Sequence, residues 1–504
     1  MELFANLALG MQTAFSLEAL LFCFAGVFVG TFVGALPGIG PLVAISVTLP
    51  LTFGLDSTIA LIMLAGIFYG AQYGGSVTSI LLNLPGTAST AVTALDGYPM
   101  TRDGRAGLAL FTNAAASFAG SSLAIILVMA FAPAIGRIAM DFNSTEYFSV
   151  MVLGLVAAST LSNGSTIKSF AMITFGLILG LVGMDLNSGA QRYTFGILQL
   201  TDGLSLIAVA MGMFGVAEII NKIAAPDSTA TQRGAGGIGL RAMLPRRDEL
   251  RRFWGPTGRG AALGSMVGAL PGAGPSIASF MAYAVEKRVS RDPGKFGKGA
   301  IEGVAAPESA NNASVQAAFI PTLSLGIPGD VVMAVLLGAM MMHGVVPGPA
   351  FISNEPAMFW ALVVSFWIGN VMLLVLNIPL IGLFVKLVSI PGRFLYPTVM
   401  FFICMGSYSI NNSTFDVYVT LVFGVLGYIL LRFGFQPAPV LLGFILGPLI
   451  EENLRRSLVI ARGDPMVFLD RPVSVALLSL SLLLILAPIL RHLVVRWRGA
   501  RHAG

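Results

Sequence analysis

The chain has 504 residues, of which 56% are hydrophobic and only 11% are charged. An ordinary soluble domain is about 25% charged, and a globule of this length needs a wet surface. The composition therefore excludes an ordinary soluble protein and predicts one embedded in a membrane. The net charge of +5 is gathered in a few loops, so it does not indicate nucleic-acid binding.

Apolar segments follow one another along the chain. We expect an all-α polytopic membrane protein with roughly 10–12 crossings and additional broken or re-entrant helical segments. Runs long enough to span a bilayer lie at 17–35, 106–133, 167–184, 199–221, 260–283, 358–385, 416–433 and 473–490. Shorter or Gly/Pro-interrupted runs lie at 42–55, 57–72, 76–95, 312–327, 331–346, 394–411 and 437–450.

An octet is repeated in the most hydrophobic surroundings of the chain. "GALPGIGP" occupies 34–41, and "GALPGAGP" occupies 268–275. A second Pro-Gly break follows each copy, first in "LLNLPG" (81–86) and then in "SLGIPG" (324–329). Two breaks in the same order and at similar spacing predict two homologous halves.

The basic residues give these halves an orientation. The segment 222–259 carries eight Lys and Arg against three acids, and the tail after residue 490 is basic as well. By the positive-inside bias we expect both to be cytoplasmic and the N-terminus to be periplasmic. We predict a first membrane repeat at 1–221, a basic cytoplasmic linker at 222–259 and a second repeat with additional C-terminal helices at 260–504. Halves that start on opposite sides form an inverted repeat, the common plan of secondary transporters.

The Pro-Gly breaks are candidate binding apparatus. Proline removes a backbone donor and glycine frees the chain to turn, so a break inside a membrane exposes groups that need protein, water or a ligand. Half-helix N-termini attract anions, and unwound carbonyls can coordinate a cation. A simple kink, or close packing of small residues, is the structural alternative.

Polar residues around the breaks supply the remaining groups. We predict that substrate carboxylates bind at Gly38, Gly40, Ser76, Asn83, Gly86, Thr87, Gly272, Gly274, Ser276, Asn311, Asn312 and Gly329. We predict that the coupling cation uses Glu308, Ser314 and Asp330. The alternative for Glu308 is an interfacial cap or ion pair, and for Asp330 it is the N-cap of a helix. We expect the segments 37–41, 83–89, 271–276, and either 308–314 or 326–330, to form loops around one central site.

Other chemistry is missing from the sequence. No P-loop motif is present, and the three histidines are too scattered to build a metal site. "GAGGIG" (234–239) fits a nucleotide-binding pattern but lies in a polar basic loop with no strand before it. We therefore expect no enzymatic activity, no organic cofactor and no metal beyond a transported Na⁺ ion.

Long motifs resemble those of one known family. They include "YGAQYGGSVTSILLNLPGTAS" (69–89), "DGYPM" (96–100), "FGKGAIEGVAAPESANNA" (296–313) and "LGIPGDVVMAVLLGAMMMHGVVPGP" (325–349), together with both octets. Over about residues 10–490 the chain resembles the large membrane subunit of tripartite tricarboxylate transporters, the TctA family. The resemblance departs from the family pattern at Asp330, where members often carry a small neutral or hydroxyl residue.

The resemblance implies a set of partners and an energy source. It implies carboxylate import across the bacterial inner membrane, driven by a Na⁺ or H⁺ gradient and not by ATP. It also implies a small four-helix membrane subunit and a periplasmic binding protein that delivers the substrate, of the citrate, tricarboxylate or dicarboxylate class. A passive anion channel is the alternative function, because the same breaks could line a selectivity filter.

Overall fold

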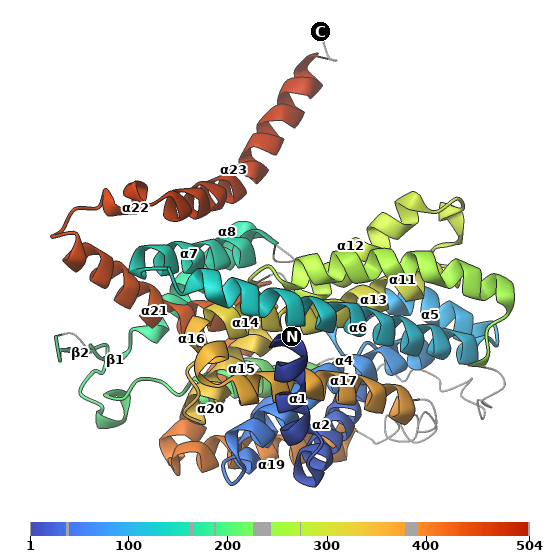
Figure 1. Cartoon of the computed structure of the whole chain (residues 1–504), viewed down its shortest axis with the longest axis horizontal. Coiled ribbons are helices and arrows are strands. Elements are labelled where there is room, and N and C mark those ends of the chain that lie inside the picture. Colours follow the sequence, from blue (N-terminus) through green and yellow to red (C-terminus); the bar gives the residue numbers. More distant parts are fainter. Residues whose placement is uncertain are drawn as a thin grey trace. The chain divides into compact units, whose positions relative to one another are not determined.

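The computed structural model describes the whole chain except residues 1, 37–39, 162–164, 186–187, 225–242, 273, 378–391 and 502–504. Helices make up nearly all of the described chain (Figure 1). The described residues contain one small antiparallel sheet. It pairs two strands of two residues each, β1 (Gly183–Met184) and β2 (Gln191–Arg192). The predicted all-α polytopic fold is therefore confirmed.

The chain forms two compact units, and each takes residues from both predicted repeats. Unit 1 comprises Met1–Arg137 and Ser205–Phe433, and unit 2 comprises Ile138–Leu204 and Gly434–Gly504. The units thus cut across the sequential division into two repeats and a linker.

Unit 1 holds most of the helices. They are α1 (Glu2–Ala14), α2 (Leu17–Ala35), α3 (Pro41–Thr48), η1 (Leu49–Thr52), α4 (Ser57–Leu82), η2 (Ala88–Thr90), α5 (Ala91–Arg102), α6 (Ala106–Ala139, whose last two residues fall in unit 2), α9 (Leu206–Ala210), η4 (Met211–Val216), α10 (Ala217–Ala224), α11 (Arg247–Gly268), α12 (Gly274–Val289), η6 (Pro293–Lys295), α13 (Glu302–Ala317), α14 (Phe319–Leu325), α15 (Val331–Met342), α16 (Pro349–Asn354), α17 (Pro356–Asn377), α19 (Gly392–Asn411) and α20 (Thr414–Arg432).

Unit 2 is smaller. Besides the strands it holds α7 (Ser144–Leu161), α8 (Thr166–Gly180), η3 (Leu198–Leu200), α21 (Ala438–Ile460), α22 (Val467–Asp470) and α23 (Pro472–Arg501). Helix α8 packs closely on α21, because Cβ atoms at Gly176 and Gly180 would collide with the α21 backbone at Val440 and Phe444. A ring of two acids and two arginines, Asp185, Arg192, Glu451 and Arg455, ties the β1–β2 segment to α21.

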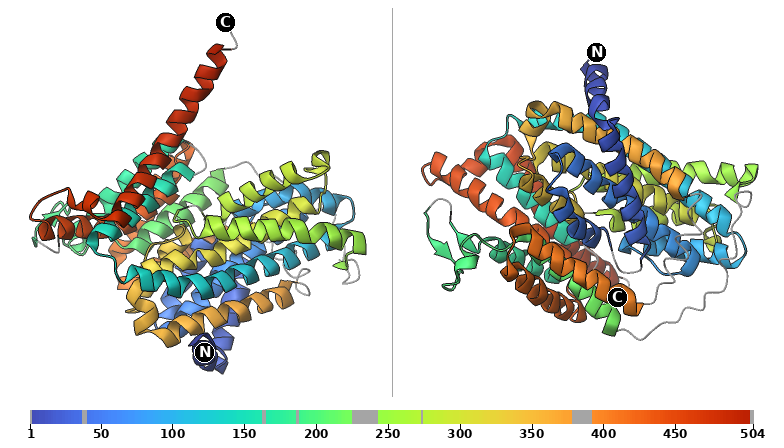
Figure 2. Two further views of the ribbon diagram at one scale, coloured as in Figure 1. Left: turned by 45° about the horizontal axis from the view of Figure 1, so that its top comes forward. Right: turned by 90° about the horizontal axis from the view of Figure 1, so that it is seen from below.

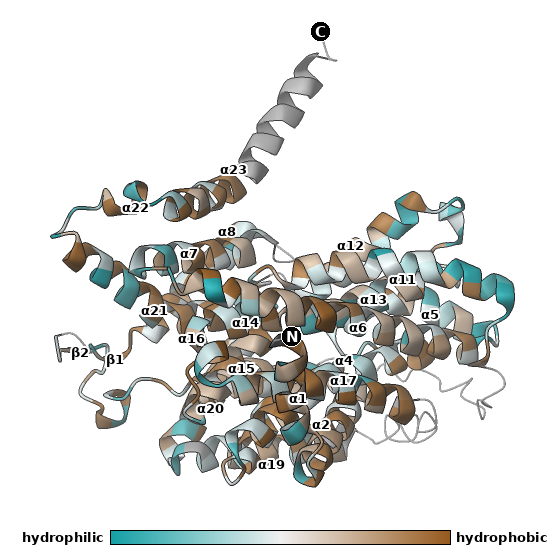
Figure 3. Cartoon of the chain, viewed as in Figure 1, coloured by the Kyte–Doolittle hydropathy of each residue, from teal (hydrophilic) through white to brown (hydrophobic). Residues whose placement is uncertain are grey.

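Six helices in the described chain are long and apolar enough to cross a membrane. They cover Leu17–Ala35, Ser57–Leu82, Ala106–Ala139, Leu206–Ala224, Pro356–Leu376 and Thr414–Arg432. Shorter apolar helices follow at Pro41–Thr52, Thr166–Gly180, Val331–Met342 and Pro472–Leu486. Figure 3 shows the hydrophobic colouring of these helices and the hydrophilic first turns of α11.

Two predicted segments differ from the structure. The region 57–82 is one continuous helix, α4, whereas the sequence suggested separate runs at 57–72 and 76–95. Conversely, the predicted span 260–283 is divided between α11 and α12 at the second octet. Helix α11 also begins at Arg247, inside the predicted linker, where Arg252 pairs with Glu302 of α13.

Helix α1 packs along α17 at the edge of unit 1 (Figure 2).

A stripe of glycines places two helices in backbone contact in each half. Helix α2 packs along α4, and α11 packs along α13. In the first half a Cβ at Gly26, Gly30 or Gly34 would overlap the backbone oxygen of Met63, Ile67 or Ala71. In the second half a Cβ at Gly260, Gly264 or Gly268 would overlap that of Ala306, Ala310 or Ser314. Each stripe has a spacing of four residues and ends on the first glycine of an octet, so the repeat extends well beyond the octet itself.

The second break closes a helix in the same way in both halves. Helix α4 ends at Asn83, which caps it in the left-handed conformation with φ of 56°. Helix α14 ends at Gly326, which does the same with φ of 69°. A left-handed cap satisfies the last carbonyls of a helix and turns the chain, and glycine and asparagine tolerate it best. Leu-Pro-Gly or Ile-Pro-Gly follows each cap directly.

Candidate functional site

The two breaks of each half meet in space. In the second half, the Gly272 N–H donates to the Gly329 carbonyl oxygen at 2.7 Å. In the first half, a Cβ at Gly86 would overlap the backbone oxygen of Gly34, so the second break lies directly against the start of the first. Gly38 falls outside the described residues. Segments far apart in the sequence are thus brought together twice, once per half.

A new helix starts after each break, and these helices pair across the halves. Helix α3 from the first half packs against α15 from the second, and α12 from the second half packs against η2 and α5 from the first. The repeat makes α3 equivalent to α12, and η2–α5 equivalent to α15, so the two pairs are counterparts of each other. The candidate site therefore lies where the halves join. Of the two alternatives for the fourth loop, 308–314 lies within helix α13, and the break is the one at 326–330.

The first-half break carries a network of hydroxyl groups. The Gln72 side-chain oxygen accepts from the hydroxyls of Thr87 at 3.0 Å and Ser89 at 2.7 Å. Ser79 donates to the hydroxyl of Thr90 at 2.9 Å. These five residues join the middle of α4 to the turn that starts α5, and they form a neutral, largely buried network of hydroxyl and amide groups at the break.

Glu308 lies at the junction of the halves. Its side chain is fully buried in α13. The Ser76 hydroxyl of α4 donates to Oε2 at 2.7 Å, and the Thr93 hydroxyl of α5 donates to Oε1. Asn311 and Ser117 lie beside the same carboxylate. The interfacial cap or ion pair considered for Glu308 is absent from the described structure, because hydroxyl groups and no basic side chain hold its carboxylate.

Helix α13 carries several buried polar atoms that have no hydrogen-bond partner among the described residues. The Asn312 amide donates to the Ser117 hydroxyl at 2.8 Å and to the Glu308 carbonyl at 3.1 Å, which fixes its orientation. Its oxygen is buried and accepts no hydrogen bond from the described residues. The unpartnered buried atoms on this helix are Asn311 Nδ2 and Oδ1, Asn312 Oδ1, Ser314 Oγ and Gln316 Oε1. Buried polar groups normally find partners, so Asn311 and Asn312, which lie three and four residues after Glu308, mark a candidate ligand site.

The other predicted residues have different surroundings. Asp330 is the N-cap of α15, and its Oδ1 accepts from the Met333 N–H at 2.8 Å. The Ser314 backbone packs against Gly268, in the contact between α11 and α13. Ser276 lies half-buried in the first turn of α12, and Gly40 is the N-cap of α3. Gly274 lies beside Asp330, with an added Cβ 3.5 Å from the Asp330 Cβ.

Sequence reasoning missed Thr93, Ser117 and Asp96. We call Asp96 and its hydrogen-bond donors from the second half the Asp96 latch. The Asp96 side chain is fully buried, and its Oδ1 accepts from the N–H groups of Gly297, Gly299 and Ala300 at 2.8–2.9 Å. Tyr283 donates to Oδ2 at 2.9 Å. Asp96 is the single charged residue between Asp56 and Arg102, and this was the available signal.

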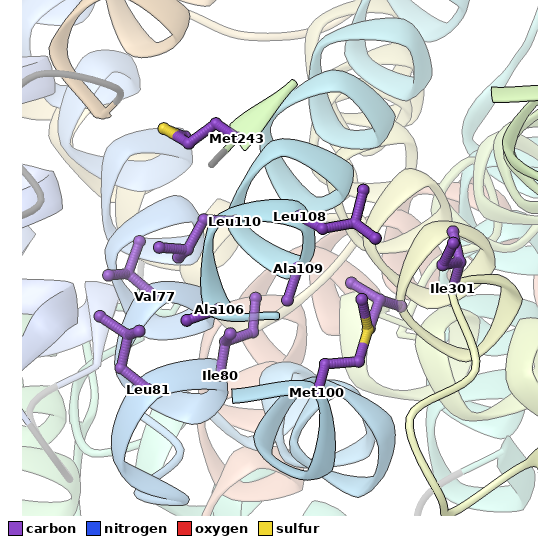
Figure 4. Packing of buried hydrophobic residues seen from close by; sticks show 11 residues of the cluster. Val77, Ile80, Leu81, Met100, Ala106, Leu108, Ala109, Leu110, Met243 and Ile301 are labelled. Atoms are coloured by element: carbon purple, nitrogen blue, oxygen red, sulfur yellow. The ribbon is translucent and has the colours of Figure 1, made fainter. Parts of the chain in front are cut away.

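An apolar cluster fixes the helices next to Glu308. Val77, Ile80 and Leu81 of α4 pack with Met100 of α5 and with the first turns of α6 (Figure 4). Ile301 and Val304, on the approach to Glu308, belong to the same cluster. The cluster therefore holds the first-half hydroxyls and the second-half carboxylate in register. Among the described residues, no group of three or more His, Cys, Asp and Glu could hold a metal ion.

The chain is similar to known proteins over most of its length. The model of the tripartite tricarboxylate transporter TctA family matches residues 20–442. A 52.8 kDa protein of Agrobacterium vitis, described as uncharacterized and located in the TAR-I ttuC' 3' region, is 49% identical over 482 residues, covering 96% of this chain and 95% of the relative. A second A. vitis protein, from the TAR-II ttuC' 3' region, is 54% identical over 227 residues, covering 45% of this chain and 94% of the relative. No solved structure matches the chain. The chain belongs to the TctA family of tripartite tricarboxylate transporters.

Proposed function

We propose that this chain forms the translocation pathway of an ion-gradient-driven carboxylate importer of the bacterial inner membrane. A periplasmic binding protein would deliver the substrate, and a small four-helix membrane subunit would complete the complex. Family membership supports a role as one component of a tripartite transporter. The energy source, the carboxylate class and the delivery route are our proposal.

One observation carries this proposal: in each half the second Pro-Gly break contacts the octet that holds the first, at Gly34 and at Gly272. Broken helices expose backbone N–H groups and hydroxyls inside protein, where an anion can replace water. Around the first-half break, the Thr87 and Ser89 hydroxyls donate to the neutral Gln72 side chain, and they would turn from Gln72 to a substrate carboxylate when it binds. A carboxylate can therefore bind there and also leave, which a transporter requires.

The test is uptake of radiolabelled citrate into vesicles that contain this chain, the small membrane subunit and the binding protein. The vesicles are given an inward Na⁺ gradient, an inward proton gradient or neither. We expect accumulation above the external concentration that collapses when the Na⁺ gradient is dissipated. Uptake that only equilibrates, with or without a gradient, would contradict secondary transport and favour a passive anion channel. A panel of dicarboxylates and tricarboxylates then identifies the substrate class.

Variants at the breaks test the site itself. Replacing Asn312 with Leu removes an oriented amide next to Glu308, and we expect loss of uptake with normal membrane expression. Asn83→Leu is expected to have the same effect on uptake. Asn83 also caps α4 in a left-handed conformation. The matched control is therefore Asn83→Gly, which keeps the left-handed cap and removes only the side-chain amide. Normal uptake in both Leu variants would refute this site.

A further inference from the structure

We infer that Glu308, with Ser76, Thr93 and Asn311, forms a binding site for one monovalent cation, Na⁺. This inference deepens the proposed transport function, on which it rests for its physiological meaning, because it names the site of the coupling ion. The site itself is argued from the charge and the oxygen atoms around one carboxylate.

The first step concerns charge. The Glu308 carboxylate is fully buried, and no Lys, Arg or His of the described residues pairs with it. Burial of an unpaired charge is strongly unfavourable even after the protein relaxes. The neutral side chains that surround it, Ser76, Thr93, Asn311 and Ser117, offset only part of that penalty. The carboxylate therefore needs either a proton or a cation.

The second step separates a proton from a cation. A protonated carboxyl supplies one donor and can satisfy a single acceptor. Asn311 and Asn312, three and four residues after Glu308 on α13, each have a buried side-chain oxygen without a partner among the described residues. A cation is shared by several oxygens at once. The hydroxyls of Ser76 and Thr93 can join them, because each keeps lone pairs after donating to the carboxylate.

The third step concerns the charge and type of the ion. One carboxylate balances one positive charge, and every candidate ligand atom is a hard oxygen, which suits an alkali ion. A divalent ion normally draws on more than one carboxylate, and a transition metal prefers nitrogen or sulfur. Among the described residues no group of three His, Cys, Asp or Glu side chains meets here or elsewhere.

The site also has the right position to influence both halves. Ser76 and Thr93 belong to α4 and α5 of the first half, whereas Glu308 and Asn311 belong to α13 of the second. An ion that needs all of these oxygens binds only when the halves hold this register. Helix α5 begins at the hydroxyl-lined break, so the ion and the carboxylate substrate are linked through one short helix.

The experiment measures saturable binding of ²²Na⁺ to the purified full-length chain, in choline buffer at neutral pH. We expect Glu308→Gln to weaken binding by more than about tenfold. Thr93→Val should weaken it clearly, and Thr93→Ser, which keeps the hydroxyl, should restore it. The matched control is Glu146→Gln, which makes the same change at another buried carboxylate, in unit 2, and should bind like the parent protein.

Several results would overturn the inference. These are an absence of saturable Na⁺ binding in the parent chain, or equal affinity in Glu308→Gln and Glu146→Gln. Binding lost in both Thr93 variants would also contradict it, because a ligand role requires rescue by serine. Citrate uptake on the same variants separates this site from the proposed function. Uptake without Glu308-dependent Na⁺ binding overturns the site alone, whereas Na⁺ binding without uptake supports the site and contradicts the transport proposal.

Discussion

The contact between α11 and α13 can be tested with two glycines on the same helix. A Cβ at Gly264 would overlap the backbone oxygen of Ala310, whereas a Cβ at Gly258 meets nothing within 4 Å. Gly264→Ala must therefore push α11 away from α13, the helix that carries Glu308. Gly258→Ala makes the same chemical change on the exposed side of α11 and serves as the control.

The expected sizes follow from two opposing effects. Alanine favours a helix interior over glycine by roughly 0.5–1 kcal/mol, so Gly258→Ala should be neutral or stabilising. Gly264→Ala gains the same amount but pays an overpacking penalty of typically about 1–3 kcal/mol. The colliding atom belongs to the backbone and cannot rotate away, which favours the upper part of this range. Because the helix preference cancels, the difference between the two variants reports the packing penalty alone.

The measurement is the thermal unfolding midpoint of each purified variant in one detergent, followed by size-exclusion chromatography. We expect Gly264→Ala to unfold at a clearly lower temperature than Gly258→Ala. Gly30→Ala should behave like Gly264→Ala, because a Cβ at Gly30 would overlap the Ile67 oxygen in the equivalent contact of the first half. Equal midpoints for Gly264→Ala and Gly258→Ala would refute the close approach of the two backbones.

Three further predictions use the same unfolding assay. Asp96→Asn removes the charge that accepts three backbone N–H groups and should cost roughly 1–3 kcal/mol; Asp292→Asn, at an exposed pair with Lys295, should cost less than about 1 kcal/mol, and equal effects would contradict the latch. Asn83→Leu should cost roughly 1–2 kcal/mol because leucine resists a left-handed conformation, whereas Asn83→Gly should be neutral; a stable Asn83→Leu would exclude the cap. In unit 2, Asp185→Asn breaks the ion pairs with Arg192 and Arg455 and should cost about 1–3 kcal/mol. Glu452→Gln, at an exposed helical ion pair, should cost less. Equal effects of the two substitutions would show that the ring does not stabilise unit 2.

The repeat was the part of the fold that the sequence predicted best. A Pro-Gly break inside an apolar run is compatible with few structures. The recurrence of the octet at 34–41 and 268–275 correctly located the start of helix α3 in the first half and of helix α12 in the second. The glycines at 26, 30 and 34, and at 260, 264 and 268, were also present in the sequence. In a chain with 59 glycines, their spacing alone does not predict a helix contact. Their role in close backbone packing is seen only in the structure, where they lie against α4 and α13.

The sequence leaves the fourth loop open between 308–314 and 326–330, and in the structure the break lies at 326–330. Proline disfavours a helix interior. In the structure α13 continues through Pro307, packed along α11, so tertiary contacts outweigh the local preference. The partners of Glu308 were equally hidden, since Ser76 and Thr93 lie more than two hundred residues away in the sequence.

The two halves share a backbone plan but differ in charge. In the register set by the glycine stripes and the left-handed caps, Thr87 corresponds to Asp330, and Ala65 corresponds to Glu308. The first half therefore presents hydroxyls where the second presents a carboxylate at a helix N-cap. It presents a methyl group where the second buries an acid. A duplicated pair of breaks can bind two ions of the same sign, but exchanging these residues suits one pair to an anion and the other to a cation. The proposed transport of a carboxylate together with a cation would use this difference, because Glu308 and Asp330 have no acidic counterparts in the first half.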